Sequence, residues 1–169
     1  EEADVERLIT ALLGGYHACV FAYGQTGSGK THSMEGGANE DMGIVPRAIE
    51  SLFARLAENC TDDGGDYTVR CSFSQIYQEH IHDLLVNDTE TSQLVSLRVR
   101  WDRHKAFYVE NLSSFQVSSA EEATTLYQRG VSRRVVSGHL LNAASSRSHC
   151  IYTLELERVD PNHSEQTVT

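Results

Sequence analysis

The octapeptide Gly24-Gln25-Thr26-Gly27-Ser28-Gly29-Lys30-Thr31 matches the pattern G-x-x-x-x-G-K-[ST], whose fixed positions each have a task in phosphate binding. Glycines permit a tight loop whose amides turn toward phosphate oxygens, beside the positive end of the following helix. Lys30 supplies a charge for the outer phosphates, and the Thr31 hydroxyl is a ligand for Mg²⁺. An apolar run precedes the motif and a helix-compatible run follows it, which favours a nucleotide site over a glycine turn with a surface lysine.

A second polar cluster is Asn142-Ala143-Ala144-Ser145-Ser146-Arg147-Ser148-His149, just ahead of an expected strand. Taken alone, it could be a solvated serine-rich loop. In a chain that also has a phosphate loop, these side chains suit a second task. Hydroxyls and an arginine can close over the terminal phosphate, help to hold Mg²⁺ and position the attacking water.

Secondary-structure patterns place these motifs between helices and strands. Apolar residues recur at helical spacing from Val5 to Leu13, and Gly14-Gly15 is a C-terminal stop. The run from Ala18 to Tyr23 is expected to be a short buried strand that leads into the phosphate loop. After a glycine-rich stretch, Pro46 fits the first turn of another helix, whose apolar face contains Ile49, Leu52, Phe53 and Leu56.

The second half of the chain is predicted to be mainly β-structure with one more helix. Ser118 with Glu121, or Ser119 with Glu122, has capping-box spacing for that helix, and Gly130 is expected near its end. Interleaved helices and strands predict an α/β domain with a central sheet flanked by helices. The expected strands cover residues 67–77, 95–99, 107–109, 115–117 and 149–159.

Composition excludes several classes of function. The 169 residues, 40% of them hydrophobic, suffice for one domain or part of one, and the formal net charge of −10 argues against nucleic-acid binding. The same charge disfavours this chain as the main docking surface for an acidic polymer. The longest apolar run is far shorter than a membrane span, and the first residues do not form a secretory signal, so we expect no membrane insertion and a cytosolic location. Four scattered cysteines suggest free thiols rather than a zinc site or disulfides.

At this point a family resemblance is clear. AYGQTGSGKTHSMEG (Ala22 to Gly36), followed downstream by NAASSRSH, resembles the kinesin motor domain. Further similar segments extend the resemblance over essentially the whole chain: GIVPRAIESLF (43–53), SFSQIYQEHIHDLL (72–85) and FYVENL (107–112). The resemblance implies a P-loop NTPase fold with a kinesin-like mixed sheet. It also implies an ATPase stimulated by microtubules, which couples hydrolysis of Mg-ATP to movement or force in the cytoplasm and the microtubule cytoskeleton.

The resemblance also implies roles for single residues in nucleotide binding. Gly24 to Thr31 would hold the phosphates of ATP, and Tyr16 and His32 would pack against the adenine. Thr31 and Ser146 would be the protein ligands of Mg²⁺, with Ser146 also sensing the γ-phosphate.

Other residues would act in the catalytic step. Asn142 and Ser145 would help to place the water. Arg147 resembles the family arginine that pairs with a glutamate of switch II, and Arg134, next to Arg133, lies where family members have an arginine that supports switch I.

The chain departs from the family in several places. Gln75 and Gln78 stand where the family usually has Glu and Asn, and both changes are chemically mild. No D-x-x-G-x-E switch II follows switch I; residues 62–65 have D-x-x-G spacing, but they lie in a polar loop upstream, so we reject them. The family's first strand, its R-x-R-P element and its main microtubule-binding helices are also absent. We therefore expect residues 1–169 to be a partial motor domain, with microtubules contacted mostly through other parts of the parent protein and any oligomerisation made through a stalk.

Three alternatives to a kinesin motor are also compatible with a phosphate loop. A myosin-like switch would continue with Phe-Gly where this chain has Ser148-His149, and Gln25-Thr26 also favours kinesin. Other phosphate-loop ATPases or GTPases are the second alternative. A non-catalytic, microtubule-binding relative would be expected to lose Lys30, Thr31 or Ser146, and all three are present.

Overall fold

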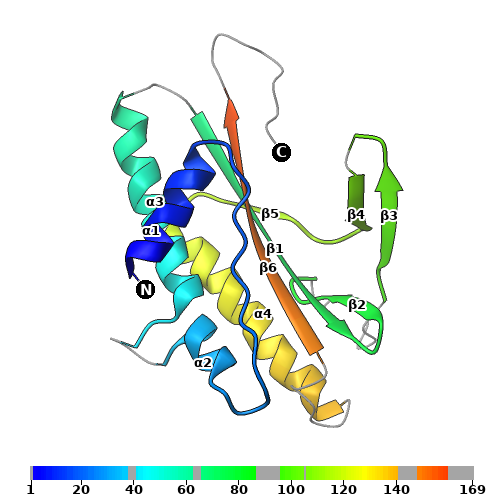
Figure 1. Ribbon diagram of the computed structural model, residues 1–169. Helices are drawn as coiled ribbons and strands as arrows, with labels where there is room; N and C mark the ends of the chain where they lie inside the picture. Colours follow the sequence, from blue (N-terminus) through cyan, green and yellow to red (C-terminus); the bar gives the residue numbers. More distant parts are fainter. Residues whose placement is uncertain are drawn as a thin grey trace. The chain divides into compact units, whose positions relative to one another are not determined.

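The structure is a computed structural model that describes residues 2–37, 41–62, 66–86, 96–104, 106–140 and 148–159. The chain divides into two compact units. Unit 1 comprises Glu1–Val69, Val117–Thr124 and Glu155–Thr169, and unit 2 comprises Arg70–Gln116 and Thr125–Leu154. Along the described residues, three helices are followed by five strands, a fourth helix and a last strand (Figure 1), in the order α1 (Glu2–Leu13), α2 (Lys30–Glu35), α3 (Ile44–Asp62), β1 (Asp66–Tyr77), β2 (His80–Asp83), β3 (Arg98–Asp102), β4 (Ala106–Glu110), β5 (Phe115–Val117), α4 (Ala120–Leu140) and β6 (Ser148–Val159).

The strands among the described residues form two sheets. In the larger sheet the order is β2-β1-β5, and β6 also pairs with β1. Strands β1 and β2 are antiparallel, with Gln75 opposite His82. Gln75 is buried in this strand, and Gln78 lies in the following turn with φ of 49°. The family's Asn is one of the non-glycine residues that adopt this left-handed conformation most readily.

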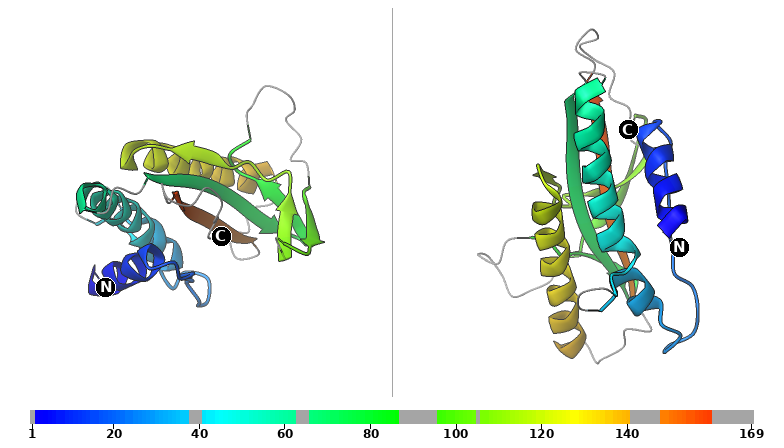
Figure 2. Two further views of the ribbon diagram at one scale, coloured as in Figure 1. Left: turned by 90° about the horizontal axis from the view of Figure 1, so that it is seen from above. Right: turned by 90° about the vertical axis from the view of Figure 1, so that its left-hand side faces the viewer.

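Unit 1 is built on the packing of α1 against α3, which lie side by side in Figures 1 and 2. Val5 and Ile9 of α1 are buried, as are three apolar residues of the face predicted for α3, Ile49, Leu52 and Leu56. These burials confirm both predicted helices. The contact is completed by Glu6, whose carboxylate accepts hydrogen bonds from Ser51 Oγ at 2.6 Å and from Arg55 at 3.0 Å. The Ser51 bond first, and then Arg55, lower the pKa of Glu6.

The start of α4 confirms one of the two predicted capping boxes. Ser119 Oγ accepts a hydrogen bond from the Glu122 amide at 3.2 Å. The Glu122 carboxylate in turn accepts bonds from the amide of Ser118 at 2.7 Å and its hydroxyl at 2.9 Å, which lower the pKa of Glu122. Ser119 and Glu122 are therefore the capping pair. In a standard capping box the amide of the N-cap residue donates to the Glu carboxylate, and here the amide of Ser118 does so instead.

Unit 2 contains a cluster of aromatic rings from three elements. Phe73 of β1, Tyr127 of α4 and Tyr152 of β6 have ring centroids 5.1–5.6 Å apart. Tyr152 donates its hydroxyl to Cys71 Sγ at 3.3 Å, and burial raises the pKa of both groups. At the end of β2, the buried Asp83 accepts bonds from the amides of Leu85 and Ser113, both at 2.7 Å.

The prediction for Gly130 is wrong. This glycine lies in the interior of α4, which continues to Leu140, rather than near the end of the helix. A Cβ at Gly130 would lie 2.2 Å from Cδ1 of Phe73. The residue is therefore a glycine because an aromatic ring occupies the space of its side chain, and not because the helix stops there.

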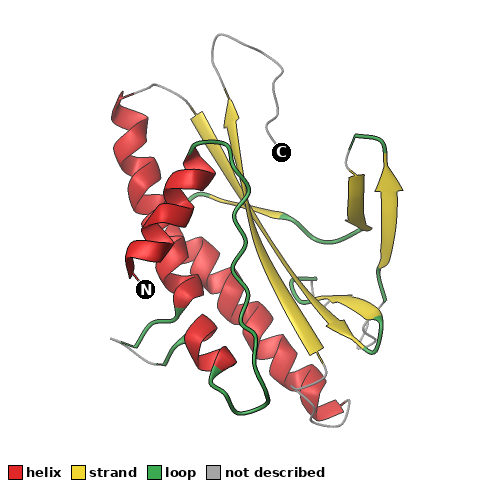
Figure 3. Ribbon diagram, in the orientation of Figure 1, coloured by secondary structure: helices red, strands yellow, loops and turns green. Residues whose placement is uncertain are grey.

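The predicted strand at residues 18–23 is also wrong. This segment is an extended loop with no ladder to any described strand (Figure 3), and its Val20, Phe21 and Tyr23 are exposed. The residues have strand-forming character, but a strand also needs a hydrogen-bonded neighbour. Further along, the strand expected at 95–99 is shifted to Arg98–Asp102, and α3 continues to Asp62 in place of part of the expected loop.

No helix among the described residues has the length and apolar character needed to cross a membrane. In the same part of the chain, no group of three or more metal-binding side chains is found. Cys19, Cys71 and Cys150 are free thiols.

Candidate nucleotide-binding site

The predicted phosphate loop, residues 24–31, folds as a turn that runs directly into a helix. The amide of Ser28 donates to Gln25 O at 3.2 Å, and Gly29 caps the N-terminus of α2 with φ of 88°. A residue with a Cβ would be strained in that left-handed conformation, so glycine is required at the point where the loop becomes helical. The turn is exposed and leads into Lys30, the first residue of α2.

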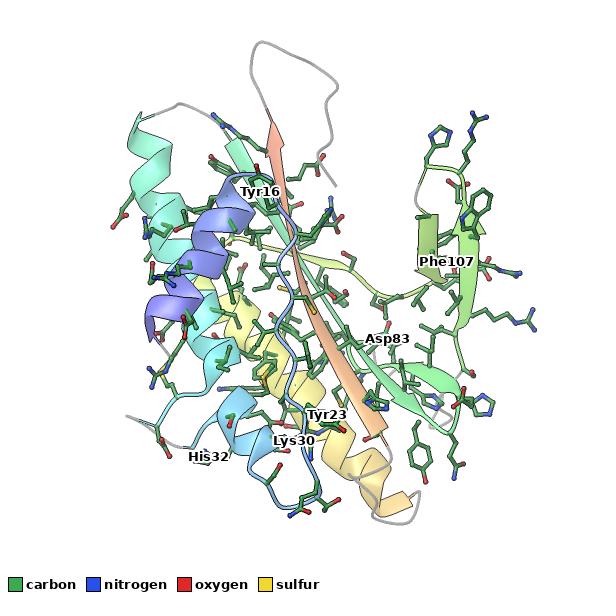
Figure 4. All side chains as sticks on the ribbon, in the orientation of Figure 1. Tyr16, Tyr23, Lys30, His32, Asp83 and Phe107 are labelled. Atoms are coloured by element: carbon green, nitrogen blue, oxygen red, sulfur yellow. The ribbon has the colours of Figure 1, made fainter. Side chains whose placement is uncertain are left out.

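Lys30 folds back over the loop that precedes it (Figure 4). Its Nζ donates hydrogen bonds to the carbonyl oxygens of Gly24 at 2.7 Å and Gln25 at 2.6 Å. The ammonium group is thereby held at the loop, where the pattern predicts phosphate. Thr31 is the next residue of the helix and is exposed. A positive charge and a hydroxyl group therefore occupy consecutive positions at the start of α2.

Tyr16 and His32, the two residues expected to pack against the adenine, lie in different parts of unit 1. His32 belongs to α2, and its Nε2 lies 2.9 Å from Asp41 Oδ2. Tyr16 follows α1, where its amide donates to Ala11 O at 3.0 Å, and its side chain is 71% exposed. Figure 4 places Tyr16 and His32 at opposite ends of the extended segment between them. The structure does not bring these two side chains together, and their joint packing on adenine stays a prediction.

The predicted switch I residues Asn142, Ser145, Ser146 and Arg147 lie outside the described residues. Only the end of that motif is described, where Ser148 and His149 begin β6.

The two arginines upstream of the switch lie in α4. Arg133 donates to Leu84 O at 3.4 Å and to Val86 O, and the neighbouring Arg134 is half-buried. Arg129, one turn earlier, also donates to Val86 O, at 3.0 Å. These bonds tie α4 to the segment that follows β2.

Sequence reasoning missed a basic and aromatic surface on the β3–β4 hairpin. Trp101 and Phe107 are cross-strand partners, and they are 65% and 76% exposed. Arg98 and Arg103 are exposed beside them, and Arg100 pairs with Glu110 at 3.0 Å. The chain-wide net charge concealed this surface; the local run RVRWDRHK, with four Arg or Lys against one Asp, is the signal that reveals it.

Comparisons with known proteins define first a class and then a family. Two solved structures superpose on this chain with TM-scores of 0.80 and 0.82. The first is KIF14[391-772] in a dimer, two-heads-bound state with AMP-PNP in complex with a microtubule, at 39% identity, and the second is a fast kinesin, at 32% identity. They confirm the predicted P-loop NTPase fold with a mixed sheet and helices.

The family follows from the sequence as a whole. The model for the kinesin motor domain matches residues 1–169, so this chain belongs to the kinesin motor domain family. One curated relative, carboxy-terminal kinesin 2 of Xenopus laevis, is 39% identical over 157 residues, which is 91% of this chain and 24% of that protein. The match to the KIF14 structure covers 95% of this chain and 44% of the KIF14 chain, and the match to the fast kinesin covers 94% of this chain and 45% of the other. It therefore spans less than half of the kinesin structures it matches.

Proposed function

We propose that this chain is the ATP-binding part of a microtubule-based motor that couples hydrolysis of Mg-ATP to movement or force. The observation that carries the proposal is the phosphate loop, with Lys30 held over it at the start of α2, in a member of the kinesin motor domain family. We propose residues 1–169 as a partial motor domain, whose activity depends on further parts of the parent protein.

The reaction is phosphoryl transfer to water, for which positioning and charge stabilisation are the main contributions of a protein. Lys30 neutralises charge on the outer phosphates, and loop amides of residues 24–31 donate hydrogen bonds to the phosphate oxygens. Mg²⁺, when bound, neutralises phosphate charge; the Thr31 hydroxyl, exposed at the start of α2, suits it, with Ser146 as the second protein ligand.

The catalytic step is assigned to the switch motif. Asn142 and Ser145 position the attacking water, and Arg147 pairs with a carboxylate of the parent motor. These assignments rest on the motif alone, in a chain whose phosphate loop leads directly into α2 and holds Lys30 by two hydrogen bonds.

Microtubule contact is proposed to include the β3–β4 hairpin, together with parts of the parent outside this chain. The surface of a microtubule is acidic, and a chain with net charge −10 would be repelled from it on average. The hairpin is the local exception, because exposed Arg98 and Arg103 flank the aromatic pair of Trp101 and Phe107. This function places the parent protein in the cytoplasm, on the microtubule cytoskeleton.

The test uses two variants of the parent motor and two measurements. Lys30→Ala removes a charge-assisted phosphate contact of about 1.5–3 kcal/mol and should weaken Mg-ATP binding at least about tenfold in a fluorescent-nucleotide titration. Arg98→Glu with Arg103→Glu should leave that affinity unchanged and lower microtubule-stimulated phosphate release. Unchanged ATP affinity in Lys30→Ala would refute the nucleotide site.

The same measurements separate the motor from a non-catalytic relative. A protein that binds Mg-ATP through Lys30 but releases no phosphate, with or without microtubules, would be a nucleotide-dependent binding protein rather than a motor. Retention of Lys30 and Thr31 at the start of α2 favours the motor.

A further inference from the structure

Asp41 contacts the helix that follows the phosphate loop, although no motif includes it. Its Oδ2 lies 2.9 Å from Nε2 of His32, and His32 is two residues beyond Lys30 in α2. An ionised carboxylate can only accept a hydrogen bond, so Nε2 carries the shared proton. In a neutral ring, Nδ1 is then left as an acceptor.

The backbone around Asp41 is closely packed in a way that produces this contact. Gly36 and Met42 form an antiparallel bridge, and the Gly37 amide donates to Asp41 O at 2.7 Å. A Cβ at Gly36 would lie 2.2 Å from Asp41 O, and a Cβ at Gly43 would lie 2.5 Å from Gly36 N. Residues with side chains would force these two backbone segments apart, so the glycines permit the approach that brings Asp41 to His32.

We propose that Asp41 is a positioning residue for recognition of the nucleotide base. It holds the His32 ring in one tautomer and one orientation, so that the ring is ordered before adenine arrives. A side chain ordered in advance loses less conformational entropy on binding, and this increases affinity. The inference rests on the proposed function, in which His32 packs against adenine.

The exposure of His32 and Asp41 distinguishes a role in positioning the His32 ring from a role in stabilising the fold. The side chains of His32 and Asp41 are 63% and 69% exposed, and an exposed polar contact of this kind contributes little to the stability of a fold. The positioning role therefore predicts altered base binding with an unchanged melting temperature.

The test measures ATP, ADP and inorganic tripolyphosphate as competitors for the site in the parent motor. Asp41→Ala should weaken ATP and ADP alike, by about threefold to tenfold for the loss of one ordering hydrogen bond, and leave tripolyphosphate unchanged. Asp41→Asn keeps an acceptor oxygen and should restore most of the affinity. Glu50→Ala, the same charge change at an exposed site on α3, is the matched control and should change none of the three.

A spectroscopic measurement reports the tautomer directly. In mildly alkaline buffer, ¹⁵N chemical shifts of His32 should show Nε2 protonated in the wild-type protein and in Asp41→Asn. Asp41→Ala should give a mixture of tautomers. In a His32→Ala background, Asp41→Ala should cause no further loss of ATP affinity, because the two residues act as a unit.

The outcomes distinguish this proposal from the proposed function. Lys30→Ala should weaken all three competitors, and its failure to do so would refute the phosphate site itself. If Lys30→Ala behaves as expected but Asp41→Ala changes neither nucleotide affinity nor the His32 tautomer, the role of Asp41 is refuted and the site stands. Equal loss of tripolyphosphate in Asp41→Ala would also overturn it, because that ligand has no base.

Discussion

Lys30 is held by two carbonyl oxygens of its own loop, those of Gly24 and Gln25. An ammonium group has three donors, and phosphate oxygens carry more negative charge than carbonyls do. Binding of a triphosphate to the proposed site would therefore exchange neutral acceptors for charged ones at a side chain that is already in place. The two hydrogen bonds lie within the loop itself. They support the assignment of residues 24–31 as a phosphate loop without any contribution from the rest of the site.

At the same scale, Ser146 and Arg147 are expected to act in the catalytic step more than in initial binding, because they organise charge that develops in the transition state. In the parent motor, Ser146→Ala and Arg147→Ala should each lower steady-state turnover by about tenfold or more and change ADP affinity little. Phosphate release and ADP titration measure the two quantities. Normal microtubule-stimulated turnover in both variants would show that residues 142–149 are not a switch.

The position of helix α4 depends on a close contact of Gly130 with Phe73. The side chain of alanine would overlap the ring, since a Cβ there lies 2.2 Å from Cδ1. We expect Gly130→Ala to destabilise the fold by about 1–3 kcal/mol through overpacking, even though alanine is intrinsically better in a helix by about 1 kcal/mol. Urea unfolding of the parent motor measures this.

The matched control is Thr125→Ala, an alanine substitution at an exposed position of the same helix. It should change stability by less than about 0.5 kcal/mol. A double variant, Gly130→Ala with Phe73→Leu, should recover part of the loss, because the smaller side chain makes room. If Gly130→Ala were as stable as the wild type, the packing of α4 on β1 would differ from that described here.

At the scale of the whole molecule, the chain exposes apolar surface beside the phosphate loop. Phe21 is 81% exposed and Tyr23 is 94% exposed, in a segment with strand-forming residues but no ladder. Unpaired segments of this kind promote aggregation. We expect residues 1–169, expressed alone, to self-associate and to show no microtubule-stimulated turnover.

The comparison for that prediction is a protein extended at both ends to the length of a kinesin motor domain. It should be monomeric or a defined oligomer by light scattering, and it should release phosphate when microtubules are added. The extended Lys30→Ala variant provides the inactive control. Comparable stimulated turnover by residues 1–169 alone would contradict the proposal that the rest of the parent is required.

The amino-acid sequence by itself determined the features that depend on neighbouring residues. The phosphate loop, the apolar faces of α1 and α3, a capping box at Ser118 or Ser119 and the long strand β1 all follow from local spacing, and the motifs identified the family. Tertiary structure decided the features that depend on residues distant in sequence. Residues 18–23 form no strand because pairing needs a neighbour, and Gly130 lies inside a helix because Phe73, 57 positions earlier in the numbering, occupies its side-chain space. Likewise, the contact of Asp41 with His32 depends on the antiparallel β-bridge between Gly36 and Met42, which no local sequence pattern predicts.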